Sequence, residues 1–184
     1  MMKTLAHILG ILPVIALSAC SVTPSPLPTV ERVDLARFMG DWYVIASIPT
    51  FIERDAYNAV ESYELVSDKR VATTFRFNKG AFDGPLKTYN PTGFVGSDPS
   101  NAIWGMQFVW PIKADYRVMY LDAGYTQTVI GRNKRDYVWI MARTPSIPEA
   151  DYGTIEKLVA EQGYDISKIR RVPQRGPATG AGQP

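Results

Sequence analysis

The feature that most constrains the fold is a series of short runs rich in β-branched and aromatic residues, lying between residues 41 and 143. Turn signals such as Ser67-Asp68 and Asp122-Ala123-Gly124 separate the runs. Eight short strands at this even spacing are typical of a β-sandwich or an up-and-down barrel. We expect the strands at residues 41–48, 57–66, 70–79, 86–96, 102–110, 115–121, 125–131 and 136–143.

Several of these runs alternate, so that one face of each strand is apolar. Trp104, Met106 and Phe108 share one face of the fifth strand, and Phe75 and Phe77 share one face of the third. In a closed eight-stranded barrel the inward face is either packed solid or encloses one small ligand. The pattern alone leaves both arrangements open.

One helix is expected after the strands. It begins at Pro148-Glu149 and ends at Gly163, and Ile155, Leu158 and Val159 form an apolar face at i, i+3 and i+4. A last short segment, residues 166–172, is expected to pair with or cover the edge of the barrel.

The first residues have the layout of a secretory signal. Lys3 supplies a positive charge, residues 5–17 are mostly apolar, and small residues precede Cys20. The apolar run is shorter than the roughly 20 residues that a spanning helix needs. We therefore expect residues 1–19 to be a signal peptide.

The two ends of the mature chain differ in composition from its middle. Residues 21–30 are rich in Pro, Ser and Thr, which predicts a flexible tether over residues 20–33. Residues 174–184 are rich in Gly, Pro and Ala and are expected to be disordered. The folded domain is therefore expected at residues 34–173.

Charge and rare residues exclude several classes of function. The formal net charge is +2, and no basic cluster is interleaved with aromatic residues, so nucleic-acid binding is not expected. The only Cys is Cys20 and the only His is His7, both near the N-terminus. This excludes Ser-His-Asp and Cys-His catalysis, a His or Cys zinc site and an intrachain disulfide from the mature chain. No nucleotide-binding glycine motif is present, so neither cofactor nor metal is expected.

The segment Leu17-Ser18-Ala19-Cys20 resembles the lipobox of bacterial lipoproteins. The resemblance implies that a diacylglycerol is transferred to the Cys20 sulfur and that the chain is cleaved before this residue. Ser21 follows the cysteine, where Asp would imply retention in the inner membrane. A lipid anchor in the outer membrane, on its periplasmic face, is the expected location.

Three ordered segments resemble the signatures of the lipocalins, in the bacterial outer-membrane lipoprotein group of the calycin superfamily. These are Gly40-Asp41-Trp42 after the short helical segment at Leu35, then Ala114-Asp115-Tyr116 with Tyr120, and Arg143-Thr144-Pro145. The resemblance covers residues 34–172 and implies an all-β fold, an eight-stranded antiparallel up-and-down barrel with one C-terminal α-helix. The second motif departs from the family because Ala114 replaces a threonine.

The resemblance also implies roles for single residues. Trp42 is expected to seal the closed end of the barrel, with Arg143 lying across it as a cation–π partner. Gly40 is expected to allow a turn or close approach that a Cβ would block. These are structural roles and not catalytic ones. The positions expected to face the calyx and bind ligand are Phe75, Phe77, Trp104, Met106, Phe108, Tyr116, Val118, Tyr120, Tyr137 and Trp139.

Apolar walls with a few hydroxyl groups suit an acyl chain with a polar end, so the expected ligand is a fatty acid or a lysophospholipid. Such a protein would store, scavenge or transport lipid in the cell envelope. A homodimer is left open, because two open barrel rims can meet.

Two other functions stay open. One is a structural or interaction lipoprotein with a filled barrel and no continuous cavity. The other is a carboxylate-dependent lipid-modifying enzyme, which needs paired carboxyl groups in the pocket. Its candidate residues, all on or near expected strands, are Glu61, Glu64, Asp115 and Asp122. Glu61 faces either the calyx or the solvent at the rim, and the rim is favoured because burying an unpaired charge is costly.

Overall fold

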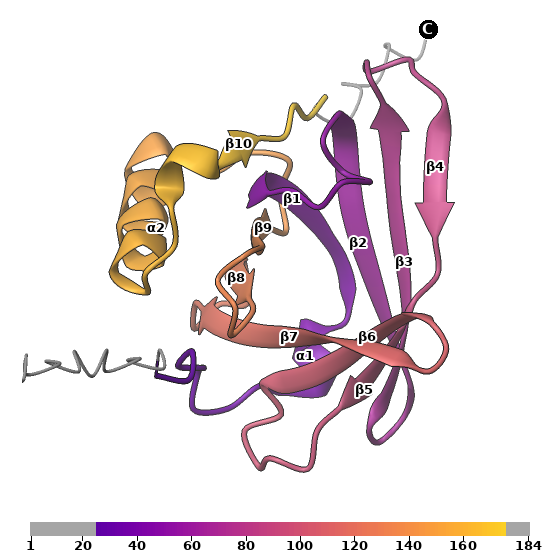
Figure 1. Ribbon diagram of the computed structural model, residues 1–184, viewed down its shortest axis with the longest axis vertical. Helices are drawn as coiled ribbons and strands as arrows, with labels where there is room; N and C mark the ends of the chain where they lie inside the picture. The colour runs from indigo at the N-terminus through magenta and orange to yellow at the C-terminus, as the bar shows by residue number, and fades with distance from the viewer. Residues whose placement is uncertain (1–24, 176–184) are drawn as a thin grey trace, which may run out of the picture.

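The computed structural model describes residues 25–175, which form one antiparallel sheet closed into a barrel (Figure 1). Closure comes from β1, which pairs with β2 on one side and with β9 on the other. The strands are β1 (Gly40–Ile48), β2 (Ala56–Ser67), β3 (Arg70–Lys79), β4 (Leu86–Tyr89), β5 (Thr92–Val95), β6 (Ile103–Val109), β7 (Ile112–Leu121), β8 (Gln127–Gly131), β9 (Val138–Ala142) and β10 (Arg170–Arg171). The helices are α1 (Leu35–Phe38), α2 (Glu149–Glu161) and the 3-10 turn η1 (Ile166–Lys168).

The predicted eight-stranded barrel with one main C-terminal helix is confirmed. The expected strand over residues 86–96 is split into β4 and β5 at Asn90-Pro91, and both halves pair with β3. Pro91 has no N–H to donate, so the ladder is interrupted there. Strand β7 begins at Ile112, three residues earlier than expected, because β6 and β7 meet in a tight turn.

Two apolar cores lie on opposite faces of β1 and β9. On β9, Trp139 and Met141 point into the barrel, whereas Val138 and Ile140 point outward. The outward residues pack against Ile155 and other residues of α2, which lies on the outside of the barrel (Figure 1). A strand covered on both faces carries apolar residues at nearly every position, which explains why β9 shows little alternation.

Helix α2 and the segment after it agree with expectation. The buried face of α2 is formed by Tyr152, Ile155 and Val159, the predicted Leu158 is half-buried, and Gly163 follows the end of the helix with φ +85°. Strand β10 then pairs with β1 at Ala46 and Ser47, so the last segment covers an edge of the barrel. Within residues 25–175, neither α2 nor any other helix is long and apolar enough to cross a membrane.

The N-terminal segment is more ordered than its composition predicts. Leu27 is fully buried on the outside of the barrel, and Val33 is fully buried in the inner core. The Val30 N–H donates to the Val118 carbonyl at 3.0 Å. The expectation of a flexible tether is therefore wrong for residues 25–33, because apolar residues interspersed among the prolines bind this segment to the barrel. The predicted signal peptide, Cys20 and residues 21–24 lie outside the described residues.

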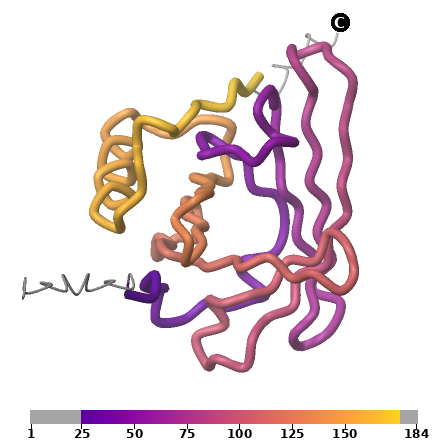
Figure 2. The backbone as a smooth tube through the Cα atoms, viewed as in Figure 1, coloured from indigo at the N-terminus to yellow at the C-terminus, as the bar shows by residue number. Residues whose placement is uncertain are grey.

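The disordered tail was expected to begin at residue 174, but residues 174 and 175 both contact the barrel. The Gln174 side chain donates to the carbonyls of Val44 and Ala59, and Arg175 forms an ion pair with Asp83 at 2.8 Å. The packed domain therefore includes residues 25–175, and residues 176–184 lie outside the described part of the chain. The tube in Figure 2 shows that the chain enters the described region on the same side of the barrel as α2.

Candidate ligand-binding site

The closed end of the barrel is built around Trp42 and Arg143. The Arg143 guanidinium lies 3.9 Å from the centre of the Trp42 ring, and the Trp42 indole N–H donates to the Phe38 carbonyl at 2.8 Å. Gly40 has φ +93°, and a Cβ there would lie 3.3 Å from an Arg143 nitrogen. The Arg143 side chain donates to five backbone carbonyls, those of Arg37, Phe38, Met39, Asp41 and Tyr125.

Above this seal, aromatic rings fill the lower part of the barrel. Trp104 and Tyr116 stack with their centroids 5.1 Å apart, and Phe38 and Tyr63 pack against Trp104 at 5.6 and 5.9 Å. Aromatic pairs at these separations contribute packing beyond their area alone. The lower part of the barrel is therefore solid, and any ligand space must lie above it.

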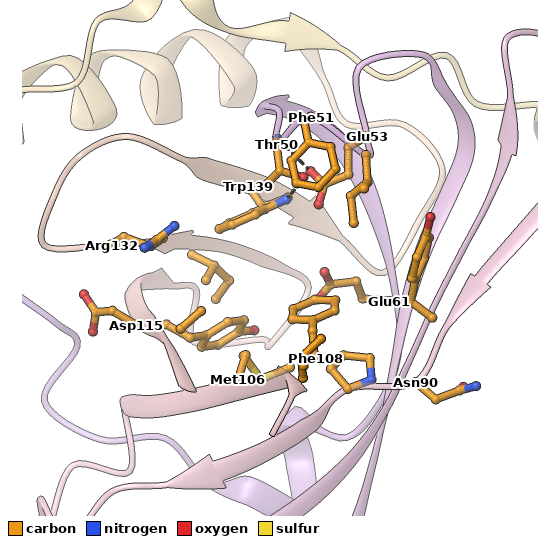
Figure 3. Close-up of a pocket in the computed structure, with 17 residues that line it drawn as sticks. Thr50, Phe51, Glu53, Glu61, Asn90, Met106, Phe108, Asp115, Arg132 and Trp139 are labelled. Carbon is orange, nitrogen blue, oxygen red and sulfur yellow. Dashed lines mark hydrogen bonds between the residues drawn. The ribbon is translucent and has the colours of Figure 1, made fainter. Parts of the chain in front are cut away.

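A cavity of about 440 Å³ lies in the upper part of the barrel and opens at its rim. This volume falls within the usual range for small-molecule sites. Figure 3 shows Trp139 and Glu53 on one side of the cavity, Met106 and Phe108 on the other, and Glu61 between them. Most of the lining is apolar or aromatic, and these residues are Phe51, Ile52, Tyr89, Pro91, Met106, Phe108, Val109, Ala114, Tyr116, Ile130 and Trp139.

The structure divides the ten residues expected to face the calyx into groups. Four line the cavity: Met106, Phe108, Tyr116 and Trp139. Four others are buried in the inner core and are not part of the lining: Phe75, Phe77, Trp104 and Val118. Tyr137 lies beside Trp139, with ring centroids 6.3 Å apart, but is not part of the lining either.

Tyr120 corrects the sequence analysis, because it packs in the outer core beneath α2 and not inside the barrel. The cause is a shift in register between Val118 and Tyr120, where β7 has one more residue than β8. Val118 faces inward, while Met119 and Tyr120 both pack outside. A strict alternation along β7 places Tyr120 inside, and a bulge reverses that assignment for all residues beyond it.

Glu53 is a buried carboxyl group that the sequence analysis missed. It lies in the loop between β1 and β2, which folds over the cavity, and it accepts a hydrogen bond from the Trp139 indole N–H at 3.0 Å (Figure 3). Burial raises the pKa of Glu53, and the Trp139 hydrogen bond opposes this shift. The adjacent apolar pair Phe51-Ile52 is the sequence signal that marks this loop as part of the wall.

Glu61 faces the cavity, so the favoured placement at the outer rim is wrong. Its register partners on the neighbouring strands are Trp42 and Phe75, which both point into the barrel. One Glu61 oxygen accepts a hydrogen bond from the Tyr63 hydroxyl, which lies 2.8 Å from the Tyr116 hydroxyl. Burial raises the pKa of Glu61 to about 7, an effect that the Glu53 charge increases.

Arg132 is the only Lys or Arg among the residues that line the cavity. It lies in the turn after β8, at the mouth, and its nearest ionic partner is Asp136 at 3.5 Å. Its buried Nε has no hydrogen-bond partner among the described residues. Asp115, also at the mouth, is already held by Arg117 at 3.0 Å and by the Asn133 N–H at 2.7 Å. The Arg132 guanidinium is therefore the group best placed to receive an anion.

The comparisons with known proteins agree with this architecture. A family model described as a lipocalin-like domain matches residues 33–174. The chain therefore belongs to the lipocalin family, whose members bind small hydrophobic molecules.

Among residues 25–175, no three His, Cys, Asp or Glu side chains form a group that could hold a metal ion.

Individual relatives are similar over most of their length. The outer membrane lipoprotein Blc of Citrobacter freundii is 29% identical over 90% of this chain and 98% of its own. Temperature-induced lipocalin-1 of Arabidopsis thaliana is 29% identical over 80% of this chain and 83% of its own. Among solved structures, insecticyanin from Manduca sexta has a TM-score of 0.63 at 15% identity, covering 81% of this chain and 84% of that one. That likeness shows the fold alone.

Proposed function

We propose that this lipocalin holds a fatty acid or a lysophospholipid in the calyx, with the acyl chain in the cavity and the anionic end at Arg132. The observation that carries the proposal is a mostly apolar cavity of about 440 Å³ with one guanidinium at its mouth. Burying ten methylene groups in such a cavity contributes roughly 8 kcal/mol before ordering costs. A charge-assisted hydrogen bond to the Arg132 guanidinium then fixes the direction of the ligand.

The location proposed for this activity is the periplasmic face of the outer membrane, with a lipid anchor on Cys20. Support comes from the lipobox-like segment that ends at Cys20 and from relatives named outer membrane lipoproteins. Two or more acyl chains hold a protein stably on a membrane. A lipid-binding barrel anchored there would store, scavenge or transport lipids within the envelope.

The two alternative functions fare differently in the structure. A filled barrel requires that no continuous cavity exist, and this barrel has one of about 440 Å³. An enzyme needs paired carboxyl groups in the pocket, and Glu53 and Glu61 both line the cavity, each accepting a hydrogen bond from an aromatic side chain. Binding without chemical change of the ligand is our proposal, and the mass of the bound lipid distinguishes it from the enzyme.

The first test is native mass spectrometry on the Cys20→Ser chain purified without detergent, followed by extraction of bound lipid. We expect an acyl lipid that is released intact and that rebinds after delipidation. A chain that purifies empty, and also fails to bind dodecanoate and lysophospholipids in titrations, would contradict the proposal. A bound lipid that is converted to a product during incubation would favour the enzyme.

The second test asks whether Arg132 receives the anionic end. Arg132→Gln is expected to weaken dodecanoate binding about tenfold and to change 1-dodecanol binding by less than twofold, because only the carboxylate uses the guanidinium. Lys134→Gln is the matched control, since Lys134 is exposed in the same turn and does not line the cavity. Equal losses for dodecanoate and dodecanol would show that Arg132 acts on the shape of the mouth only.

A further inference from the structure

The mouth of the barrel carries a group of exposed apolar side chains, which we call the apolar rim: Phe51, Phe108, Val109, Trp110 and Ile112. Trp110 is 82% exposed, Phe51 78% and Ile112 70%. The rim comes from the β1–β2 loop and the β6–β7 turn. Phe51, Phe108 and Val109 also line the cavity, so the apolar rim borders its opening (Figure 3).

This exposure is concentrated at the mouth. Nine large apolar side chains are exposed within residues 25–175, and five of them belong to the apolar rim. Single exposed apolar residues need no explanation, but a group of them marks an interaction surface for a protein or a membrane. Tryptophan in particular suits the boundary between lipid and water, because its ring is apolar and its N–H is polar.

Exposed charges beside the apolar rim are mainly positive. Arg54 lies near Phe51 in the sequence and Lys134 lies in the β8–β9 turn, whereas the Lys113 ammonium group lies 3.7 Å from the Phe94 ring centre and is directed away from the mouth. Asp55 is the exposed acidic neighbour in the β1–β2 loop, so Arg54, Lys134 and Asp55 carry a net positive charge. An apolar patch flanked by basic side chains suits a bilayer that contains anionic lipids.

The described chain begins at this same end of the barrel. The Ser25 carbonyl accepts a hydrogen bond from Arg135 at 2.9 Å, and the Leu27 N–H donates to Asn133 at 2.8 Å. Both partners lie in the β8–β9 turn, whose first residue, Arg132, lines the cavity. Cys20 is five residues before Ser25, a distance of at most about 18 Å for an extended chain. A lipid on Cys20 therefore holds the mouth, and not the closed end, near the membrane.

We propose that the open end of the barrel docks on the lipid bilayer, with the apolar rim inserted among the headgroups and the basic residues beside it contacting anionic lipids. The orientation rests on the proposed anchor at Cys20, whereas the apolar rim is independent of it. In this position a ligand passes between the bilayer and the cavity without crossing water.

A second copy of the chain is the competing occupant of this surface. Two copies that meet rim to rim would place Arg54 and Lys134 of one copy against the same residues of the other. Like charges in an interface are unfavourable, whereas anionic lipids complement them. Charge therefore favours the bilayer.

The experiment uses residues 20–184 with Cys20→Ser, so that the apolar segment at residues 5–17 is absent, and measures binding to vesicles of phosphatidylcholine with one quarter phosphatidylglycerol. We expect binding that weakens on pure phosphatidylcholine and falls at least tenfold in the Trp110→Ser/Ile112→Ser variant. Neither residue lines the cavity, so dodecanoate binding in solution reports separately on the calyx. The matched control is Leu65→Ser/Val66→Ser at the closed end, where these side chains are 37% and 53% exposed.

Tryptophan fluorescence gives a second readout. Brominated lipids are expected to quench part of the emission, and Trp110→Phe is expected to abolish that quenching because the other described tryptophans are not exposed. No vesicle binding, or equal losses in the rim and control variants, would overturn the docking proposal while intact dodecanoate binding leaves the proposed function standing. A solution dimer that Trp110→Ser/Ile112→Ser converts to monomer, without vesicle binding, would assign the apolar rim to a second copy.

Discussion

At the closed end of the barrel, each Arg143 nitrogen donates to at least one backbone carbonyl, and Trp42 is buried beneath the guanidinium. At the open end, the buried Nε of Arg132 has no partner among the described residues, and Glu61 faces the cavity, where desolvation raises its pKa to about 7. The first end satisfies its polar groups and contributes stability. The second leaves polar groups available to a ligand, and that availability costs stability.

The strongest test of this contrast is Arg143→Ala. We expect it to lower the free energy of unfolding by about 3–5 kcal/mol, since it removes the cation–π contact with Trp42 and leaves several carbonyls without a donor. Urea denaturation measures the loss. Arg170→Ala is the control, because its exposed side chain bonds only to nearby carbonyls, and we expect a change below about 0.5 kcal/mol. Similar losses for the two variants would contradict the role given to the closed end.

Glu61→Gln tests whether the carboxyl group of Glu61 at the open end lowers the stability of the folded state. Burial raises the pKa of Glu61 from its ordinary 4.5 to about 7, so the folded state holds the proton more tightly than the unfolded state. The contribution of Glu61 to stability is therefore highest below pH 4.5 and is lost as the pH rises through 7. The difference corresponds to about 3 kcal/mol, so we expect Glu61→Gln to gain up to this amount at pH 8 and almost nothing at pH 4.

Denaturation curves at the two pH values check this expectation. Other ionisable groups that face Glu61 are Glu53, Tyr63 and Tyr116, and all three stay in place in the variant. The matched control is Glu64→Gln, because Glu64 is exposed on the same strand. If Glu61→Gln gained the same stability at pH 4 and pH 8, a change in packing rather than a buried charge would be responsible.

The smallest expected effect is the difference in ligand binding between a variant of the cavity wall and a variant of the outer core. Met106→Ala is expected to weaken the binding of an acyl ligand about tenfold, because Met106 lines the cavity. Tyr120→Ala is expected to leave the dissociation constant within twofold and to lower stability by about 1–2 kcal/mol, because Tyr120 packs beneath α2. Fluorescence titration with dodecanoate as competitor distinguishes the two. A binding loss in Tyr120→Ala equal to that in Met106→Ala would restore the inward assignment of Tyr120.

How much of the site could be predicted depended on the kind of residue. Met106 and Phe108 lie on β6, where apolar residues alternate, and the pattern led directly to the cavity wall. Other lining residues come from loops, such as Thr50 to Glu53 and Arg132, which have no periodicity to read. Phe75 and Trp104 have the same inward pattern as the cavity residues but lie in the solid core. Alternation predicts which side chains point into the barrel, but it does not predict how far along the barrel axis each one lies.

The amino-acid sequence by itself determined the strand count, the closure of the barrel, the helix that covers it and the Trp42–Arg143 seal, because each depends on local patterns or on ordered motifs. Only the tertiary structure decided that Tyr120 faces outward, that Glu61 faces the cavity and that residues 25–33 pack against the barrel. The physical reason is that these outcomes depend on a one-residue bulge, on the register between strands and on burial against distant residues, which local patterns do not encode.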